Sequence, residues 1–488
     1  MKIEEMIAVE RADCSGCSAC ANICPKNAIT MTRDAEGFAY PKINPDLCIK
    51  CGRCDATCPA LNAKKNLPDA LPKVFVATYP DEKVLRHSSA GGVFSALSEI
   101  VLREGGIIFG AGFDKKFHVA HTAAHNLDEL ENLRRSKYVQ SQIGDVYRQV
   151  RDALKSQKVF FCGTPCQCAG LKHFLGGDPD NLLTADLVCH GAPSPALWEY
   201  YIGAFDDAHE VAHVNFRSKR TGWAGYRFEI NFKDRVRYSN GLGADVYGKF
   251  FLDNLTLRPS CHRCKFKFPN GQADLTLGDA WGVQKYAPEM FDNRGTSLVI
   301  VHTAKGKDFF ERLTLNKKEV NFNAAIRSNT PFITSVLADT RRKSFFDEFS
   351  KSDNKVAVLQ KYYEQDKAEL KKEPAKPGQT YNEIYRSVVE HIRKQFKRNI
   401  LIVGTPPENF KQQLEGCGVY VLKVVDGKII CTEEFSSLTF EQKDLAALND
   451  FVKRFNVTEI FVGDLANAAP VDEWIKTCGL PVQTLKAE

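Results

Sequence analysis

The pattern of apolar and polar positions between residues 73 and 205 alternates between short apolar runs and segments with helical periodicity. Such alternation is typical of an α/β sheet domain. The predicted strands cover residues 73–78, 107–113, 158–161 and 181–188, and the predicted helices cover residues 128–137, 145–156, 165–175 and 195–205, with a further helix beginning near Val93. Residues 210–240 differ, because runs such as Tyr226–Phe232 alternate with period two and predict antiparallel strands.

A second α/β pattern occupies the C-terminal part of the chain. Lys, Glu, Gln and Asp dominate residues 350–372, and Lys371–Gly378 has the composition of a linker. Strands are predicted at residues 400–404, 419–425, 428–431, 459–462 and 482–485, and helices at residues 381–396, 408–415, 440–455 and 471–478. No motif in this region assigns it a role.

The predicted fold class is therefore α/β with several domains, as expected for a chain of 488 residues. We predict an N-terminal domain at residues 1–68, a central mixed α/β domain at 73–350, a charged linker at 351–380 and a small α/β domain at 381–488.

Composition narrows the class of protein. The chain is 43% hydrophobic and 26% charged, which is typical of a globular protein. It contains no apolar run of membrane-spanning length, and acidic residues stand in Met1–Ile7 where a signal peptide needs an apolar core. These features predict a cytoplasmic protein without an integral membrane segment. The net charge of +6 suits an anionic cofactor and does not call for a nucleic-acid partner.

Seventeen cysteines indicate metal or cluster chemistry, because a reducing compartment disfavours a disulfide framework. Eight of them form two runs with the spacing C-x2-C-x2-C-x3-C-P, and each cysteine of the second run follows its counterpart by 34 residues. Three thiolates of one run hold a cubane whose fourth ligand comes from the other run. We therefore assign cluster one to Cys14, Cys17, Cys20 and Cys58, and cluster two to Cys48, Cys51, Cys54 and Cys24. Two zinc sites are a poor alternative, since zinc ligands usually occur as two separated pairs.

Four further cysteines stand in positions that suit a third metal site: Cys166, Cys189, Cys261 and Cys264. Cys166 follows a predicted strand at a helix N-terminus, where the helix dipole favours a thiolate. These four could hold a third [4Fe-4S] cluster or a structural zinc, or they could be ordinary buried cysteines.

Gly91 and Gly92 precede the helix that begins near Val93. Exposed amides at such a position bind anions, so a cofactor phosphate could lie there. A packing turn is the alternative explanation for two adjacent glycines.

The N-terminal region resembles a bacterial two-cluster ferredoxin domain, and residues 73–320 resemble the beta-subunit family of coenzyme F420 hydrogenases and dehydrogenases. Several motifs, in order along the chain, carry the second resemblance: Ser89–Ser95, Gly105–Gly110, Ser136–Gln140, Gly163–Gln167, Asp186–Gly191, Phe216–Lys219, Arg258–Cys264 and Leu275–Trp281.

This resemblance implies an FAD cofactor with an iron–sulfur centre nearby, and it strengthens the prediction of a third [4Fe-4S] cluster. The FAD contacts that it implies are Ser89, Gly91, Gly92, Ser95, Lys137, Tyr138, Gln140, Thr164 and Pro165. Lys137 is the predicted catalytic residue, because its charge could stabilise the reduced flavin. A lysine that interacts with the end of a helix dipole is the alternative. Arg217, Lys219 and Arg258 could bind an anionic substrate, or they could form a solvated face.

Two functions follow from these motifs. The first is an iron–sulfur flavoprotein oxidoreductase that exchanges electrons between ferredoxin-type carriers and a two-electron partner, either coenzyme F420 or a small organic substrate. The second is a non-catalytic electron-transfer subunit of a larger redox complex, with ferredoxin or a partner subunit as its redox partner.

Overall fold

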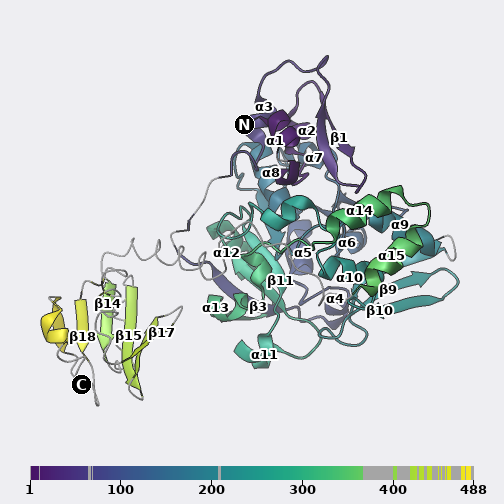
Figure 1. Cartoon of the computed structure of the whole chain (residues 1–488). Helices are drawn as coiled ribbons and strands as arrows, with labels where there is room; N and C mark the ends of the chain where they lie inside the picture. The colour runs from purple at the N-terminus through teal and green to yellow at the C-terminus, as the bar shows by residue number, and fades with distance from the viewer. Residues whose placement is uncertain are drawn as a thin grey trace. The chain divides into compact units, whose positions relative to one another are not determined.

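The structure is a computed structural model of the whole chain (Figure 1). It describes residues 2–365 apart from residues 10, 64–66, 69 and 207–209. Beyond them it describes residues 399–403, 418–425, 428–433, 437–441, 449, 452, 457, 459–462, 474–478 and 480–484. The chain forms two compact units. Unit 1 contains residues 1–66, 72–320 and 324–379, and unit 2 contains residues 67–71, 321–323 and 380–488.

The two cysteine runs at the start of unit 1 have the same backbone path. Their elements are α1 (Ile3–Val9), the 3-10 turn η1 (Arg11–Asp13), α2 (Ala19–Ile23), β1 (Ile29–Arg33), β2 (Ala39–Ile43) and α3 (Arg53–Thr57). The 34-residue repeat relates α2 to α3, and it also relates the left-handed residues Gly16 and Ser18 to Lys50 and Gly52. The repeat of the sequence is therefore also a repeat of the backbone conformation.

The centre of unit 1 is a mixed sheet of eight strands. These are β3 (Lys73–Thr78), β4 (Ile107–Phe113), β5 (Val119–Ala124), β6 (Val159–Cys162), β7 (Leu182–Leu187), β11 (Leu275–Asp279), β12 (Ser297–Val301) and β13 (Asn316–Val320). Their order is β13-β3-β12-β11-β7-β6-β4-β5. The neighbours β4, β6, β7 and β11 are parallel, and the other pairs are antiparallel.

The elements associated with this sheet are α4 (Glu82–Arg86), α5 (Val93–Arg103), α6 (Leu127–Leu133), α7 (Val146–Ala153), α8 (Pro165–Leu175), η2 (Pro259–Arg263), α11 (Val283–Tyr286), η3 (Pro288–Met290), α12 (Ala304–Glu311) and η4 (Thr330–Phe332). The short helix α13 (Phe322–Ile326) follows β13 in the sequence. The apolar face predicted for the helix from Val93 is buried, since Val93, Leu97 and Val101 are at most 1% exposed. The mixed α/β class and the division into more than one structural unit are confirmed.

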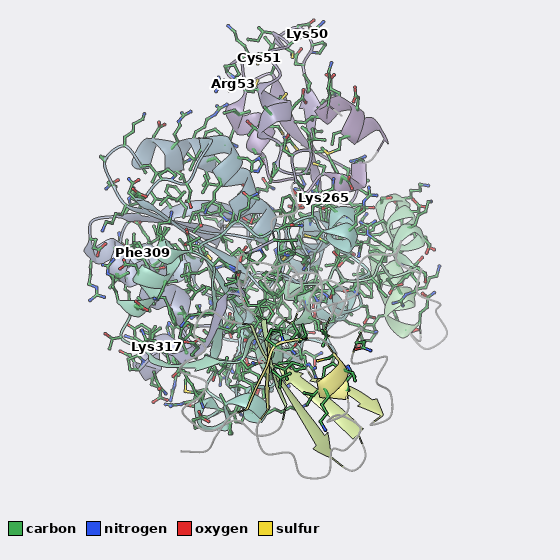
Figure 2. All side chains as sticks on the ribbon, turned by 90° about the vertical axis from the view of Figure 1, so that its left-hand side faces the viewer. Lys50, Cys51, Arg53, Lys265, Phe309 and Lys317 are labelled. Atoms are coloured by element: carbon green, nitrogen blue, oxygen red, sulfur yellow. The ribbon has the colours of Figure 1, made fainter. Side chains whose placement is uncertain are left out.

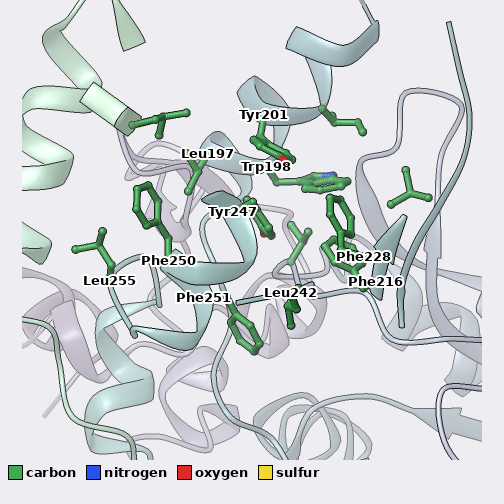
Figure 3. Close-up of a cluster of buried hydrophobic side chains, with 14 of the residues drawn as sticks. Leu197, Trp198, Tyr201, Phe216, Phe228, Leu242, Tyr247, Phe250, Phe251 and Leu255 are labelled. Atoms are coloured by element: carbon green, nitrogen blue, oxygen red, sulfur yellow. The ribbon is translucent and has the colours of Figure 1, made fainter. Parts of the chain in front are cut away.

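A smaller antiparallel sheet lies beside the central one, as the pattern of residues 210–240 predicts. It consists of β8 (Val211–Ser218), β9 (Arg227–Phe232) and β10 (Arg237–Gly241), and it packs with α9 (Pro195–Asp206), α10 (Val246–Leu252), α14 (Arg342–Lys351) and α15 (Lys355–Glu364). Figure 3 shows the aromatic core between them. Trp198 is fully buried, and its ring centroid lies 5.0 Å from Phe216 and 5.1 Å from Tyr247.

Two predicted elements differ from the structure of unit 1. The helix predicted for residues 128–137 ends at Leu133, because Arg134 is extended and Arg135 has a φ of +68°. Lys137 is therefore outside the helix. The segment predicted as a charged linker contains α15, whose Val358, Leu359 and Tyr362 are buried against the aromatic core. Residues 366–380 of that segment lie outside the described residues.

Unit 2 contains a six-stranded sheet. Its strands are β14 (Asn399–Val403), β15 (Gly418–Val425), β16 (Lys428–Glu433), β17 (Ser437–Glu441), β18 (Glu459–Val462) and β19 (Val482–Thr484), in the order β17-β16-β15-β14-β18-β19. The predicted strands are present. The helix predicted from residue 440 is wrong for residues 440–441, which pair with β16. The helices predicted at residues 381–396 and 408–415 lie outside the described residues.

Among the residues that the structure describes, no helix combines the length and the apolar character that a membrane span requires.

Candidate functional site

The structure brings together the four cysteines assigned to cluster one. Cys14, Cys17, Cys20 and Cys58 are all buried. Burial raises the pKa of Cys20, and the nearby thiols of Cys17 and Cys14 raise it further. Thiols crowded in this way hold their protons unless a cation stabilises the thiolates, and cluster irons would supply that charge.

The cysteines assigned to cluster two are closer to the protein surface. Cys24, Cys48 and Cys54 are partly buried and Cys51 is exposed. The backbone N–H of Ala28 donates to Cys24 Sγ at 3.3 Å. The two groups of cysteines therefore differ in their access to solvent.

A cavity of about 490 Å³ opens at the carboxyl ends of the parallel strands β6, β7 and β11. Ligands of open α/β sheets bind at this edge, and pockets for small molecules usually measure about 300–1,000 Å³. Eight of the nine predicted FAD contacts line the cavity: Ser89, Gly92, Ser95, Lys137, Tyr138, Gln140, Thr164 and Pro165. The four cysteines predicted for a third cluster also line it.

Gly91 is the ninth predicted contact, and packing explains it. A Cβ at Gly91 would lie 2.1 Å from the carbonyl oxygen of Ala77 and 2.5 Å from the backbone nitrogen of Ser297. Gly92 has a φ of +85°, which favours glycine, and it caps the N-terminus of α5. Both glycines are therefore required by the turn, whether or not a phosphate lies there.

The four cysteines of the predicted third site are near neighbours. Burial raises the pKa of Cys166 to about 12, and the thiols of Cys264 and Cys261 contribute. Burial also raises the pKa of Cys189, with smaller contributions from the thiols of the other three. Polar groups already contact these sulfurs, since Ala192 N–H donates to Cys261 Sγ at 3.3 Å and Thr164 Oγ1 lies 3.1 Å from Cys166 Sγ.

The spacing of these thiols bears on the zinc alternative. Within the described residues, no three Cys, His, Asp or Glu side chains are close enough to bind one metal ion. A zinc ion needs its four ligands around a single centre, whereas the thiolates of a cluster surround a larger cubane.

Helix α8 connects the predicted third site to the cysteines of cluster one. It begins next to Cys166, and one turn later Gly170 packs against Cys17 of cluster one. A Cβ at Gly170 would lie 3.0 Å from Cys17 Cβ and 3.1 Å from its Sγ. The close approach of α2 to α8 (Figure 1) therefore depends on a glycine at this position.

Gln140 and Arg258 join the cavity to the cluster-one loop. The Gln140 side chain donates to Ser15 O at 3.0 Å and accepts from Arg258 Nη1 at 3.0 Å. The buried Arg258 guanidinium also donates to Cys14 O at 2.8 Å and to Ala39 O at 3.0 Å. Its carbon Cζ lies 4.2 Å from the centroid of the Tyr40 ring. The alternative of a solvated face is therefore wrong for Arg258.

Lys137 has the contacts expected of a lysine that interacts with the end of a helix dipole. Its Nζ donates to the carbonyl oxygens of Asn132 at 2.7 Å, Arg134 at 2.7 Å and Arg135 at 3.3 Å, at the C-terminal end of α6. Burial is the main cause that lowers the pKa of Lys137 to about 7, and the positive charge of the neighbouring Arg135 contributes to this shift. The residue nevertheless lines the cavity, so its ammonium can affect the charge there.

Arg217 is held by Asp279 rather than exposed to solvent. The two side chains form a bidentate ion pair with N···O distances of 2.7 and 2.8 Å, and Arg217 also donates to Tyr138 Oη at 3.2 Å. Arg217 is 3% exposed, so the solvated-face alternative is wrong for it as well. Lys219 donates to Leu85 O and Ala90 O, and burial lowers its pKa to about 7.

Sequence patterns did not identify several residues of the cavity wall. Among them are Arg134, Arg135, Asp279 and Trp281. Trp281 stacks on Trp223 with ring centroids 5.0 Å apart. It is the last residue of the motif Leu275–Trp281, which carries the family resemblance but predicts no role for this tryptophan. Within the described residues, the Nε atoms of Arg135 and Arg217 are buried without a hydrogen-bond partner. Buried donors of this kind are rare without a ligand or water.

The charge of the cavity wall is strongly positive. Eight arginine and lysine side chains line it, against only two aspartates. The N-termini of α5 and α8 add backbone N–H groups and the positive ends of two helix dipoles. The residues present therefore fit an anionic dinucleotide such as FAD.

Family models match two parts of this chain. Residues 13–62 match the 4Fe-4S dicluster domain, and residues 156–325 match the C-terminal region of the beta subunit of coenzyme F420 hydrogenase/dehydrogenase. The match of residues 13–62 supports the prediction of [4Fe-4S] clusters in the N-terminal region.

Comparison with curated proteins finds relatives of the N-terminal region. The chain is 34% identical over 68 residues to an uncharacterized polyferredoxin-like protein of Methanocaldococcus jannaschii, covering 12% of this chain and 40% of that protein. It is 32% identical over 57 residues to the ketoisovalerate oxidoreductase subunit VorC of Methanothermobacter marburgensis, covering 11% of this chain and 72% of that relative.

Among solved structures, a chain of the F420-reducing [NiFe] hydrogenase complex from Methanosarcina barkeri is similar with a TM-score of 0.40 and 16% identity. The alignment covers 60% of this chain and 97% of that one.

The two cysteine runs and the dicluster match define an iron–sulfur electron-transfer protein. Residues 156–325 belong to the family of the coenzyme F420 hydrogenase/dehydrogenase beta subunit, and a 4Fe-4S dicluster domain occupies residues 13–62. The resemblance stated from its motifs is confirmed.

Proposed function

We propose that this protein is an iron–sulfur flavoprotein oxidoreductase that exchanges electrons between ferredoxin-type carriers and coenzyme F420 or a small organic substrate. One observation carries the proposal. Eight predicted FAD contacts and four spare cysteines, which are far apart in the sequence, line a single basic cavity beside cluster one.

The residues that would hold the flavin come from three places in the fold. Ser89 and Ser95 belong to the turn and first helical turn of α5, Lys137 and Tyr138 follow α6, and Thr164 with Pro165 begin α8. A bound flavin would supply hydride exchange with a two-electron partner and single-electron exchange with clusters. The chain would bind its phosphates with backbone N–H groups and basic side chains, and Tyr138 would be held in place by stacking on Phe251 at 4.7 Å.

The family motif implies that Gln140 contacts FAD, and we propose a different role for it. Both ends of its amide are bonded, to Ser15 and to Arg258, so it holds the cluster-one loop against the cavity wall. We propose it as a positioning residue.

A third [4Fe-4S] cluster at Cys166, Cys189, Cys261 and Cys264 is part of the same proposal. Their mutual proximity and their partial burial support it, and Lys267 in the same wall offsets the negative charge of thiolates. Helix α8 would then run from this cluster to cluster one, which gives the electrons a short path between them.

The function is tested by anaerobic absorbance. The protein is prepared without oxygen, its bound flavin is measured, and reduced coenzyme F420 and reduced ferredoxin are added separately. We expect bound FAD and bleaching at catalytic rates by at least one of the two donors. Bleaching by ferredoxin alone would direct the search to an organic substrate. A protein without flavin that bleaches only when a partner subunit is added would contradict the proposal and favour a non-catalytic electron-transfer subunit.

Replacing Lys137 with methionine tests its proposed catalytic role. If its ammonium stabilises the reduced flavin, the two-electron potential of the flavin should fall by about 30 mV or more, which is a tenfold change in equilibrium. The difference from wild type should be larger at about pH 6 than at about pH 8, because the pKa of Lys137 is about 7 and the ammonium is charged below it. Spectroelectrochemistry measures both effects. If the variant loses thermal stability but keeps the flavin potential of wild type, Lys137 only stabilises the fold through its contacts with carbonyl oxygens. The proposed catalytic role would then be wrong.

A further inference from the structure

Cluster two lies beside a small exposed surface that the proposed function does not use. We call this surface the cluster-two face and define it by Leu47, Ile49, Lys50, Cys51 and Arg53. Leu47 is 50% exposed and Ile49 is 56% exposed, which is unusual for large apolar side chains this close together. Figure 2 shows Lys50, Cys51 and Arg53 at one end of unit 1, far from Phe309 and Lys317.

Solvent access distinguishes the two clusters of the dicluster domain. All four cysteines of cluster one are buried, whereas Cys51 of cluster two is exposed. Single-electron transfer between proteins needs two redox centres to approach closely. Of the two dicluster sites, cluster two is therefore the one that a second protein can reach.

The backbone holds this face outward. Lys50 and Gly52 both have left-handed conformations, with φ of +54° and +71°. No heavy atom lies within 4 Å of the Cβ position at Gly52, so the loop is open on that side. Helix α3 then begins at Arg53.

Two basic side chains belong to the cluster-two face itself. Lys50 and Arg53 are exposed, and Asp46 is an exposed acidic residue next to Leu47. Asp55 on α3 is partly buried, and its carboxylate accepts a hydrogen bond from Ile3 N–H at 2.8 Å. Within the described residues, neither Lys50 nor Arg53 forms an ion pair, so both charges are available to a partner. An apolar centre with a basic rim is complementary to an acidic protein surface.

We propose that the cluster-two face is the docking site of an acidic one-electron carrier protein of the ferredoxin type. The inference rests on the proposed function only in that the clusters carry electrons. In each encounter one electron leaves the reduced carrier and enters cluster two, with no bond formed and no proton moved. The face is small, so the complex should be transient and formed largely by electrostatic attraction.

Stopped-flow reduction tests whether the charges of Lys50 and Arg53 attract the carrier protein. The holoenzyme is mixed anaerobically with a reduced acidic two-cluster [4Fe-4S] ferredoxin at increasing ionic strength, and cluster bleaching is followed. For wild type we expect the second-order rate to fall as salt rises. For the double variant Lys50→Glu and Arg53→Glu we expect a rate at least about tenfold lower at low salt and little dependence on salt.

The matched control changes the same net charge elsewhere in unit 1. Lys285 on α11 and Lys307 on α12 are exposed, and both helices lie far from α3 in Figure 1. The control variant Lys285→Glu and Lys307→Glu should keep the wild-type rate to within about twofold, because exposed charges beyond the Debye length are largely screened. Dithionite should reduce the clusters of all three proteins equally, which shows that the clusters are intact.

Three results would overturn the proposal. One is a wild-type rate that does not change with salt, and another is an equal loss of rate in the face and control variants. The third is a salt-resistant dimer that Leu47→Ser and Ile49→Ser dissociate, since the face would then bind a second copy of the chain. These measurements follow cluster reduction by a protein carrier and need neither flavin nor a two-electron substrate. Failure of the flavin proposal would therefore leave their outcome unchanged.

Discussion

Replacing Cys261 with serine is expected to lower the iron content by about four atoms per chain, from about twelve to about eight. The reason is that the proposed third cluster has four protein ligands, and serine is a poor ligand for iron in such a cluster. Cys261 Sγ accepts a hydrogen bond from Ala192 N–H and lies near the partly buried Cys264 thiol, so the site gives a replacement ligand little room. Iron analysis and anaerobic electron paramagnetic resonance of the reduced protein measure the loss.

Cys162 provides the matched control for this experiment. It lies in the wall of the same cavity, and it is not among the proposed ligands. Cys162→Ser should therefore keep the full iron content. If Cys261→Ser also keeps it, Cys261 is not a ligand and the third cluster must be abandoned. If wild type itself holds only about eight iron atoms, the four cysteines have another role.

Replacing Arg258 with alanine is expected to uncouple the dicluster domain from the cavity. The substitution leaves the carbonyl oxygens of Cys14 and Ala39 and the side chain of Gln140 without their buried donor. Each unsatisfied buried acceptor costs about 1–3 kcal/mol. A shift of the cluster-one loop by about 1 Å can slow a reaction that depends on its position by about a hundredfold.

Two rates distinguish this effect from general unfolding. With reduced ferredoxin as donor, the N-terminal clusters of the Arg258→Ala protein should be reduced as fast as those of wild type. Reduction of the two-electron substrate should fall by about tenfold to a hundredfold. Arg258→Lys should restore part of the rate, because an ammonium can reach some of the three acceptors but lacks the planar guanidinium.

Arg33 supplies the control for Arg258. It joins the dicluster domain to Glu199 of α9 through a half-exposed ion pair, so Arg33→Ala should change stability by less than about 1 kcal/mol. Equal losses in both electron-transfer rates of Arg258→Ala would mean that the arginine serves stability alone.

Secondary structure was predictable where a segment carries its own signal. The boundaries of β4 and α8 agree with those predicted from the apolar pattern, since Ile107–Phe113 is a continuous apolar strand and Thr164, Pro165 and Gly176 mark the ends of the helix. The end of α6 was not predictable, because the sequence through Lys137 is compatible with a helix. Tertiary contacts stop it at Leu133, where Arg134 pairs with Glu99 and Ser95 of α5.

The packing around individual residues was also hidden from the sequence. The sequence predicts that Gly91 lets a ligand approach, and the structure shows close packing of Gly91 against Ala77 and Ser297, which are 14 and 206 residues away along the chain. Gln140 and Arg258 were assigned to the flavin and to a substrate, and their side chains bond chiefly to the cluster-one loop. Such assignments depend on which distant residues meet, and local patterns carry no information about that.

The sequence by itself determined the cluster chemistry of the dicluster domain, the mixed α/β class and the family, because cysteine spacing, strand and helix periodicity and ordered motifs are local properties of the chain. Only the tertiary structure decided that the carboxyl ends of β6, β7 and β11 form one cavity, that α8 links it to the cysteines assigned to cluster one and that Cys51 of the second group is exposed to solvent. The physical reason is that cavities, burial and exposed surfaces arise from contacts between residues that are far apart in sequence, and packing against the folded whole sets those contacts.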